Sequence, residues 1–227
     1  MRTSNVAIAL EEVSVRVSRA CETSGRSPSE VQIVAVSKGV DTDRISAALA
    51  AGQRVFGENR VQEAIQKAGL IPEAQWHMVG RIQRNKVRQV LQFASAIHSL
   101  DRSELADEIE ARATQPIDCL AQVNVSGEAS KAGMDPSDVV EFAGQCSAMA
   151  KVNLVGLMTV PPPTADPEGS RPFFRLLRNL RDLVSQELES PGIHHLSMGM
   201  SQDYGVAVEE GATLLRIGTA IFGRREE

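Results

Sequence analysis

Two cations that follow apolar stretches are the side chains of this chain best suited to chemistry. Lys38 comes directly after VQIVAVS at residues 31–37, and Arg216 ends the stretch TLLR at residues 213–216. Lysine is rarely buried unless it is paired or reactive. If the two lie side by side, they could bind an anion or favour a neutral Lys38 amine for attack on a carbonyl carbon. A solvated lysine at a strand end is the third interpretation.

Two segments late in the sequence combine glycines with hydroxyl groups: a first glycine loop, SMGMS at residues 197–201, and a second glycine loop, GTAIFG at residues 218–223. Glycine lets backbone N–H groups approach a ligand, and helix starts beside such loops add donors. We therefore predict a phosphate site with the hydroxyls of Ser197, Ser201 and Thr219. A reactive lysine beside it fits pyridoxal phosphate held as a Schiff base, or a Schiff-base aldolase acting on a sugar phosphate.

Apolar strands alternate with amphipathic helices along the chain, and these elements must position the two cations. A helix opens the chain, with one face made of four regularly spaced apolar residues, Val6, Leu10, Val13 and Val17. Asp135 before Pro136 predicts a helix start, and Asp101 with Glu104 predicts a capping box. Eight strands follow the first helix, at residues 31–36, 53–57, 74–80, 95–100, 116–126, 152–160, 193–199 and 213–218.

This alternation predicts an α/β fold, a closed (β/α)8 TIM barrel with an extra N-terminal helix. A doubly wound open sheet is the alternative, but the count of eight is complete. We expect a single domain over residues 1–227, because no shift in composition marks a boundary. Active sites of such barrels lie at the C-terminal ends of the strands, and closure makes the first strand a neighbour of the eighth. Lys38 and Arg216 are therefore expected at the same mouth.

Net charge and cysteine usage restrict the class of protein. The net charge of −5 argues against nucleic-acid binding, which needs a basic face. Cys21, Cys119 and Cys146 form no Cys-x-x-Cys pair and predict a reducing compartment without a disulfide framework. We find no signal peptide and no long apolar run, so we expect a cytoplasmic protein without membrane contact. His194 and His195 should point to opposite faces of a strand, so we expect no metal there.

Eight motifs occur in order between about residues 5 and 225: VAVSK, FGENRVQE, WHMVGRIQRNK, IHSLD, VNVSGEASKAGM, GLMTV, LSMGMSQDY and GATLLRIGTAIFGRR. Together they resemble the pyridoxal-phosphate homeostasis protein family, single-domain relatives of the N-terminal barrel of alanine racemase. The resemblance implies a fold-type-III barrel with pyridoxal 5'-phosphate on Lys38 and Arg216 facing the pyridine nitrogen. A cation there keeps that nitrogen unprotonated and weakens the ring as an electron sink.

The resemblance also implies further cofactor-binding residues. Five of them surround the phosphate and two lie near the ring: Ser197, Gly199, Ser201, Gly218 and Thr219 for the phosphate, and Asn59 and His77 for the ring. The chain departs from the family pattern at two mouth positions. A proline is expected soon after the lysine, where this chain has Gly39 and Val40, and an aromatic residue after GEN, where it has Arg60. These departures concern local ring and partner contacts.

The function implied is intracellular homeostasis of pyridoxal phosphate, by buffering it or delivering it to apo enzymes, without robust turnover. A racemase on this barrel takes a second acid/base tyrosine from an additional domain. Here the sequence ends at Glu227, and its single tyrosine, Tyr204, is expected on the surface of a helix. We therefore expect no catalytic residue, no metal, and a monomer or weak dimer. A pyridoxal-phosphate-dependent amino-acid racemase is the alternative, and the sugar-phosphate aldolase comes after it.

Overall fold

Eight parallel strands close into a barrel in chain order, and this confirms the predicted (β/α)8 fold. The structure is a computed structural model that describes residues 4–128, 131–190 and 192–223. Short apolar runs form the strands, which are β1 (Gln32–Val36), β2 (Val55–Glu58), β3 (Gln75–Met78), β4 (Ala94–Leu100), β5 (Ile117–Gln122), β6 (Val152–Met158), β7 (His195–Ser197) and β8 (Leu214–Ile217). Closure pairs β1 with β8, and Val34 lies in register with Arg216.

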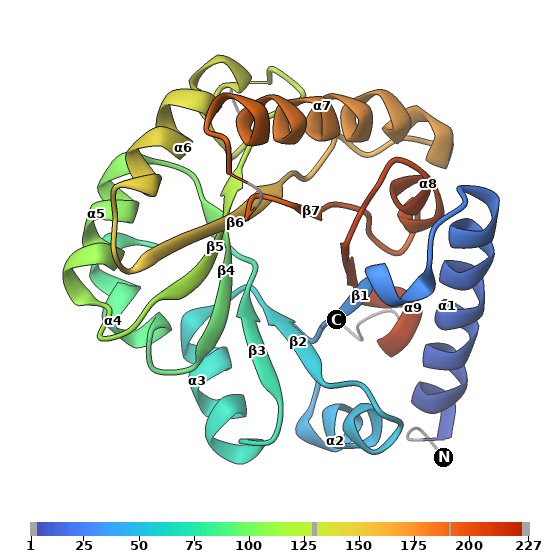
Figure 1. Ribbon diagram of the computed structural model, residues 1–227. Coiled ribbons are helices and arrows are strands. Elements are labelled where there is room, and N and C mark those ends of the chain that lie inside the picture. Colours follow the sequence, from blue (N-terminus) through green and yellow to red (C-terminus); the bar gives the residue numbers. More distant parts are fainter. Residues whose placement is uncertain (1–3, 129–130, 191, 224–227) are drawn as a thin grey trace.

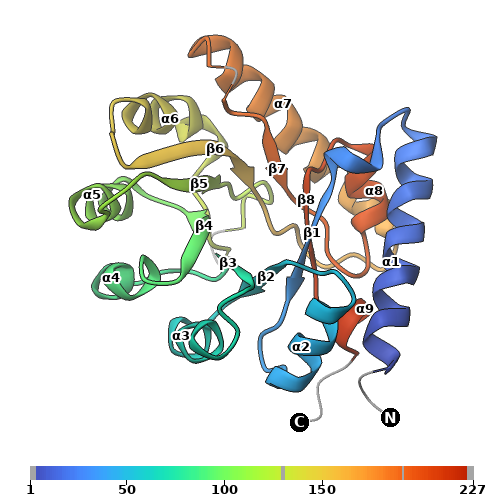
Figure 2. The ribbon, with the colours of Figure 1, turned by 60° about the horizontal axis from the view of Figure 1, so that its bottom comes forward.

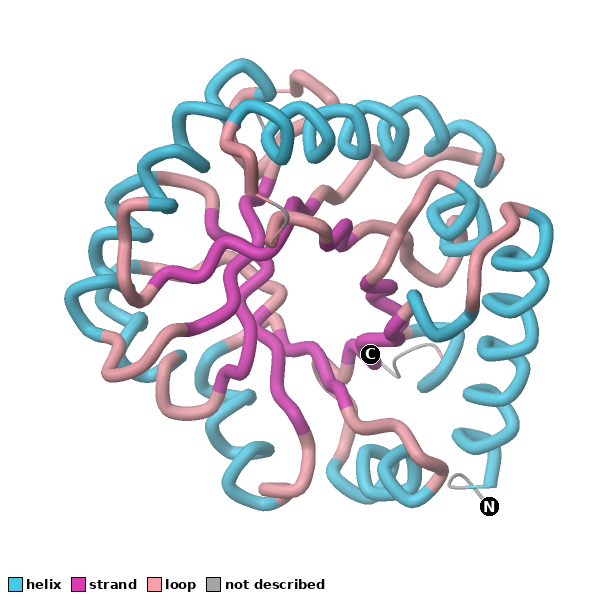
Figure 3. The backbone as a smooth tube through the Cα atoms, in the orientation of Figure 1, coloured by secondary structure: helices cyan, strands magenta, loops and turns pink. Residues whose placement is uncertain are grey.

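Helices and helical turns surround this ring of strands, as Figures 1 and 3 show. The helices are α1 (Ser4–Thr23), α2 (Thr42–Ala50), α3 (Val61–Leu70), α4 (Val87–Val90), α5 (Ser103–Arg112), α6 (Val139–Ser147), α7 (Arg171–Glu187), α8 (Tyr204–Glu209) and α9 (Thr219–Phe222). Short 3-10 turns are η1 (Pro28–Glu30), η2 (Arg84–Lys86), η3 (Pro136–Asp138) and η4 (Pro167–Ser170). In the described residues, no helix is long and apolar enough to cross a membrane.

The extra N-terminal helix packs against the last part of the chain. α1 runs alongside α8 and α9 in both Figure 1 and Figure 2. Its four regularly spaced apolar residues, Val6, Leu10, Val13 and Val17, are all buried, as their spacing predicts. The helix therefore covers the side of the barrel where β8 and β1 meet.

Apolar side chains form two separate buried clusters. The smaller cluster contains inward-facing residues of five strands, Val34, Val55, Leu120, Met158 and Leu214. The larger cluster lies between the strands and the surrounding helices. Alternation of side chains along each strand separates the two clusters, because successive residues point to opposite faces of the barrel wall. The polar residues described below lie above the smaller cluster, toward the C-terminal ends of the strands.

One of the two predicted helix starts is wrong. Asp135 accepts a hydrogen bond from the amide of Ser137 at 2.9 Å, as expected of a cap. Asp101 caps nothing: α5 begins after Arg102, without a side-chain cap. The Asp101 carboxylate is bound instead by the guanidinium groups of Arg102 and Arg81. Because the two arginines bind the carboxylate, it does not accept from the first amides of α5. The local capping pattern in the sequence does not show these contacts.

Candidate functional site

Lys38 is the second residue of a β-turn that directly follows β1. The amide of Val40 donates to the carbonyl of Ser37 at 2.9 Å and closes the turn. Gly39, the third residue, has a φ of 71°, a left-handed conformation that glycine adopts easily and proline cannot. The glycine found here, where the chain departs from the family pattern, suits the positive φ of this turn. The Lys38 side chain is half-buried.

Arg216 lies on β8, and its side chain reaches the ends of β7 and, beyond it, β6. Its Nη1 donates to the hydroxyl of Ser197 on β7 at 2.6 Å, and its Nη2 donates to the carbonyl of Thr159, just after β6, at 2.7 Å. The residue is 5% exposed. Burial lowers the pKa of Arg216 to about 10, so the guanidinium stays charged at neutral pH. Both of these partners are uncharged.

A pair of histidines continues this hydrogen-bonded chain across the barrel. His98 Nδ1 is 2.8 Å from Ser197 Oγ, and His98 Nε2 is 2.9 Å from His77 Nδ1. Burial, together with the neighbouring His77 and Arg216, holds the pKa of His98 well below its usual value. Burial also lowers the pKa of His77, to about 4, with a smaller contribution from His195. Both rings are therefore neutral at pH 7 and carry one donor and one acceptor each.

The two glycine loops meet at the mouth near α8 and α9. Ser201 of the first glycine loop accepts a hydrogen bond from the amide of Ala220 in the second at 3.1 Å. Gly199 has a φ of 88°, and a Cβ there would lie 2.5 Å from the Cβ of Ala207. A Cβ at Gly218 would lie 3.1 Å from the carbonyl oxygen of Val36. Packing within the protein thus requires glycine at 199 and leaves little room at 218.

The sequence-predicted site residues occupy several different environments. His77, Ser197 and Arg216 belong to one buried hydrogen-bonded chain, whereas Thr219 is exposed at the start of α9. Asn59 is half-buried directly after β2. Its backbone presses against Gly80, where a Cβ would lie 2.3 Å from the Asn59 carbonyl oxygen. The sequence predicts that Ser197 contacts the phosphate, but its hydroxyl is bound to Arg216 and His98. Ser201 and Thr219 lie in the two glycine loops.

Polar residues to which sequence reasoning assigned no role touch these groups. Thr159 receives a hydrogen bond from Arg216, and three side chains behind the Lys38 turn, Glu58, Glu63 and Lys67, bind one another and that turn. Glu63 and Lys67 are four residues apart on a helix, a spacing that usually means a solvated ion pair. Glu58, directly after an apolar run, was the available signal in the sequence, because a carboxylate at the end of a barrel strand is a candidate mouth residue.

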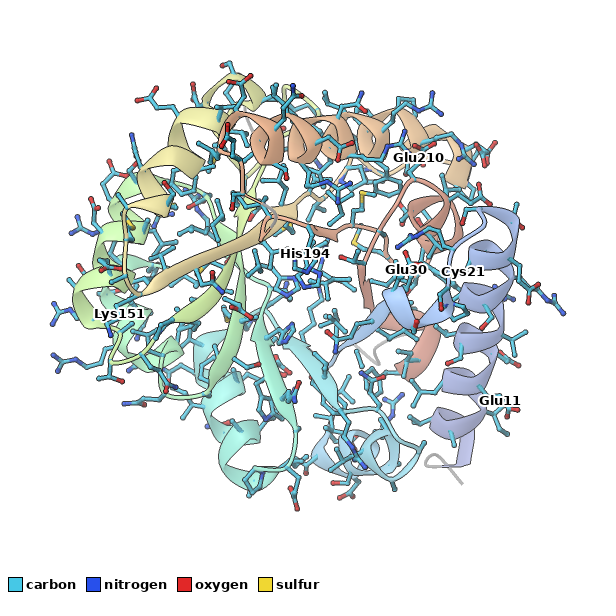
Figure 4. The ribbon with its side chains drawn as sticks, viewed as in Figure 1. Glu11, Cys21, Glu30, Lys151, His194 and Glu210 are labelled. Carbon is cyan, nitrogen blue, oxygen red and sulfur yellow. The ribbon has the colours of Figure 1, made fainter. Side chains whose placement is uncertain are left out.

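Two other expectations are wrong. Tyr204 is not a surface residue: it is 5% exposed and packs in the larger apolar cluster, because α8 lies beneath α1 and α7. His194 and His195 do not point apart: their ring centroids are 4.1 Å apart, because His194 lies just outside β7. Figure 4 shows His194 near the centre of the strand ring in that view. In the described part of the chain, no three potential metal-ligating side chains come together.

The residues present fit pyridoxal phosphate. A guanidinium carries five N–H donors, and Arg216 uses two of them on Ser197 and Thr159. A buried cation whose described partners are a hydroxyl and a carbonyl suits an electron-rich ring nitrogen or an anion. The two glycine loops contact each other and contribute backbone amides and hydroxyls at the same end of the barrel. Lys38, in the turn that follows β1, the strand paired with the Arg216 strand, supplies an amine.

Comparisons with known proteins agree with this fit. Residues 8–226 match the family described as alanine racemase, N-terminal domain. The chain is 43% identical over 222 residues to the pyridoxal phosphate homeostasis protein of Aquifex aeolicus, covering 96% of this chain and 97% of that one. The corresponding protein of Pseudomonas aeruginosa is 39% identical, with 98% and 97% covered.

Solved structures extend the comparison to the fold. PipY of Synechococcus elongatus PCC7942, solved with PLP bound, has a TM-score of 0.81 and 36% identity, covering 92% of this chain and 100% of that one. Alanine racemase of Corynebacterium glutamicum is 14% identical with a TM-score of 0.75, and covers 98% of this chain and 62% of its own. That likeness concerns the barrel alone. By sequence identity over nearly its full length, the chain belongs to the pyridoxal phosphate homeostasis protein family.

Proposed function

We propose that this chain binds pyridoxal 5'-phosphate through Lys38 and buffers or delivers the cofactor inside the cell, without robust enzymatic turnover. The observation that supports it is the buried Arg216, charged and bound to a hydroxyl and a carbonyl, on β8, which pairs with the strand that leads into the Lys38 turn. The family name and the cofactor in the PipY structure point the same way.

Each part of the site has a role under this proposal. Lys38 would hold pyridoxal phosphate through its amine, and the cofactor would supply an aldehyde carbon for that amine. Arg216 donates toward the ring nitrogen and, being charged at neutral pH, disfavours protonation there. Ser197 fixes the guanidinium, and the two glycine loops, with Gly199, Ser201, Gly218 and Thr219, hold the phosphate. Asn59 and His77 would contact the ring, as the family resemblance implies.

The carrier role is supported by how the tyrosine and two of the barrel histidines are held. Tyr204 is packed in the apolar cluster, and His77 and His98 are hydrogen-bonded to each other. A weakened electron sink further disfavours amino-acid chemistry. Apo pyridoxal-phosphate enzymes are the proposed recipients, the proposed unit is a monomeric single domain, and three free buried cysteines are in keeping with the cytoplasm.

Spectroscopy and trapping test the binding proposal. Protein incubated with pyridoxal phosphate should develop a visible absorption band, and reduction with borohydride should leave a stable adduct on Lys38. Lys38→Ala should lose both signals, whereas Lys86→Ala, also a half-buried lysine, should keep them. A band that persists in Lys38→Ala would sink the assignment of the amine.

Transfer experiments test the carrier role. Loaded protein mixed with an apo enzyme should activate that enzyme faster than the cofactor leaves on its own. Equal rates would leave buffering as the role. Racemisation or decarboxylation of an amino acid at ordinary enzyme rates, on the order of 10 per second, would overturn the non-catalytic assignment in favour of the racemase.

A further inference from the structure

The turn that carries Lys38 is held from its outer side by α3. Lys67 Nζ donates to the carbonyl of Ser37 at 2.6 Å. Glu63 Oε1 accepts from the amide of Gly39 at 2.5 Å. The carbonyl before Lys38 and the amide after it are therefore both bound by side chains of one helix.

These α3 side chains form a buried cluster with the end of β2. Lys67 Nζ lies 2.6 Å from Glu63 Oε1 and 2.7 Å from Glu58 Oε1, and the hydroxyl of Ser37 donates to Glu58 Oε1 at 2.7 Å. The side chains of Lys67 and Glu58 are 8% and 0% exposed. We name Glu58, Glu63 and Lys67 the turn clamp.

The composition of the turn clamp is poor for stability alone. Burial raises the pKa of the Glu58 carboxyl, and the hydrogen bonds from Lys67 and Ser37 offset only part of this effect. Glu58 Oε2 is buried without a hydrogen-bond partner among the described residues. Buried ion clusters of this kind stabilise little compared with apolar residues of similar size. What the cluster provides is a set of bonds to the backbone on both sides of Lys38.

We propose that Glu63 and Lys67 are positioning residues that hold the backbone of Lys38 so that its amine meets a carbonyl carbon. This rests on the proposed function. A lysine on a mobile turn must be ordered each time it reacts, and misplacement of a reacting group by a fraction of an ångström slows its reaction. The turn clamp fixes the two peptide groups from which the Lys38 side chain starts.

Glu63→Ala is the variant that isolates this role. The Glu63 side chain is 23% exposed, so water can replace part of what is lost, whereas Lys67→Met would leave the fully buried Glu58 carboxylate without its cation. Glu108→Ala is the matched control: Glu108 is 19% exposed and also pairs with a basic residue four positions along its helix, away from the mouth. Glu63→Gln keeps an oxygen that can accept from Gly39.

Two measurements separate positioning from general damage. Amide hydrogen exchange at Gly39 in the ligand-free protein should become about tenfold faster in Glu63→Ala and stay unchanged in Glu108→Ala. The rate at which the Lys38 amine and the aldehyde of pyridoxal phosphate form a C=N bond, releasing water, should fall about tenfold in Glu63→Ala. Binding of pyridoxine 5'-phosphate, which has an alcohol in place of the aldehyde, should change by less than about twofold.

The outcomes distinguish this inference from the proposed function. If the wild-type protein forms no visible band with pyridoxal phosphate, the proposed function itself fails. If the wild type forms it and Glu63→Ala matches Glu108→Ala in exchange and in rate, the positioning role is overturned. It is also overturned if pyridoxine phosphate binding falls as much as the rate does, or if Glu63→Gln is as slow as Glu63→Ala.

Discussion

The hydroxyl of Ser197 lies 2.6 Å from the guanidinium of Arg216 and couples β7 to β8 inside the barrel mouth. The same hydroxyl is 2.8 Å from His98 Nδ1, so one serine joins a charged group to a neutral imidazole. One consistent donor order runs from Arg216 to Ser197, from the serine O–H to His98, and from His98 Nε2 to His77. In this order the serine fixes both the guanidinium and the tautomer of His98.

Replacement of Ser197 by alanine should therefore destabilise the folded protein. Both partners of the hydroxyl are buried, and each would lose a hydrogen bond that water cannot easily replace. The free energy of unfolding should fall by about 1–3 kcal/mol, measured by urea denaturation. Ser103→Ala removes an exposed bond to Gln145 and should change it by less than about 0.5 kcal/mol. Equal effects of the two variants would contradict the buried coupling.

The paired histidines should make stability depend on pH. In the unfolded chain an imidazole titrates near 6.5, whereas burial lowers the pKa of His77 to about 4 and moves that of His98 in the same direction. Between these values the unfolded state binds protons that the folded state does not, so stability falls as the pH falls. From pH 7.5 to pH 5, His77 alone should remove about 2 kcal/mol.

Urea denaturation at the two pH values measures this effect in the wild type and in His77→Gln. The glutamine variant should lose less stability on acidification than the wild type, because it lacks one of the shifted groups. His194→Gln, which changes an exposed ring, should behave like the wild type. An identical loss in wild type and His77→Gln would show that His77 is not held neutral.

The strands, the barrel and the position of Lys38 could be predicted, because they depend on local patterns. Apolar runs and helical spacing repeat within short windows, and closure then brings β1 beside β8. The partners of the site residues depend on contacts across the chain: His98 binds Ser197, 99 residues away. Lys67 has the sequence pattern of a solvated helix lysine, yet it is buried because β2 presents Glu58 beneath it. Such pairings are set by the closed barrel.

The first glycine loop should tolerate no side chain at Gly199. A Cβ there would lie 2.5 Å from the Cβ of Ala207, and the φ of 88° is itself unfavourable for alanine. Gly199→Ala should lower the free energy of unfolding by about 2 kcal/mol or more and weaken binding of pyridoxine 5'-phosphate. Binding can be followed by calorimetry.

Gly205 gives the matched control from the neighbouring helix. It lies within α8, and a Cβ there would meet nothing within 4 Å. Gly205→Ala should raise stability by about 0.5–1 kcal/mol, because alanine restricts the unfolded chain and favours a helix. A destabilisation of similar size in both variants would mean that the loss of stability in Gly199→Ala comes from the packing of α8 and not from the conformation of Gly199.

Glu210 should hold α7 against α8, the helix that follows the first glycine loop. Its carboxylate, 4% exposed, lies 3.0–3.1 Å from the guanidinium groups of Arg171, Arg175 and Arg178, and Figure 4 shows Glu210 between the two helices. Burial raises the pKa of Glu210, but the arginines outweigh this effect and bring the pKa below its usual value.

Glu210→Ala should lower the free energy of unfolding by about 2–3 kcal/mol. This loss is smaller than that expected for a fully buried ion pair, because the arginines stay hydrated. Glu209→Ala, which removes one half-buried contact to Arg171, should cost less than about 1 kcal/mol. Urea denaturation measures the free energy of unfolding of both variants. Equal losses in Glu210→Ala and Glu209→Ala would contradict the special contribution of the buried Glu210 and its three arginines.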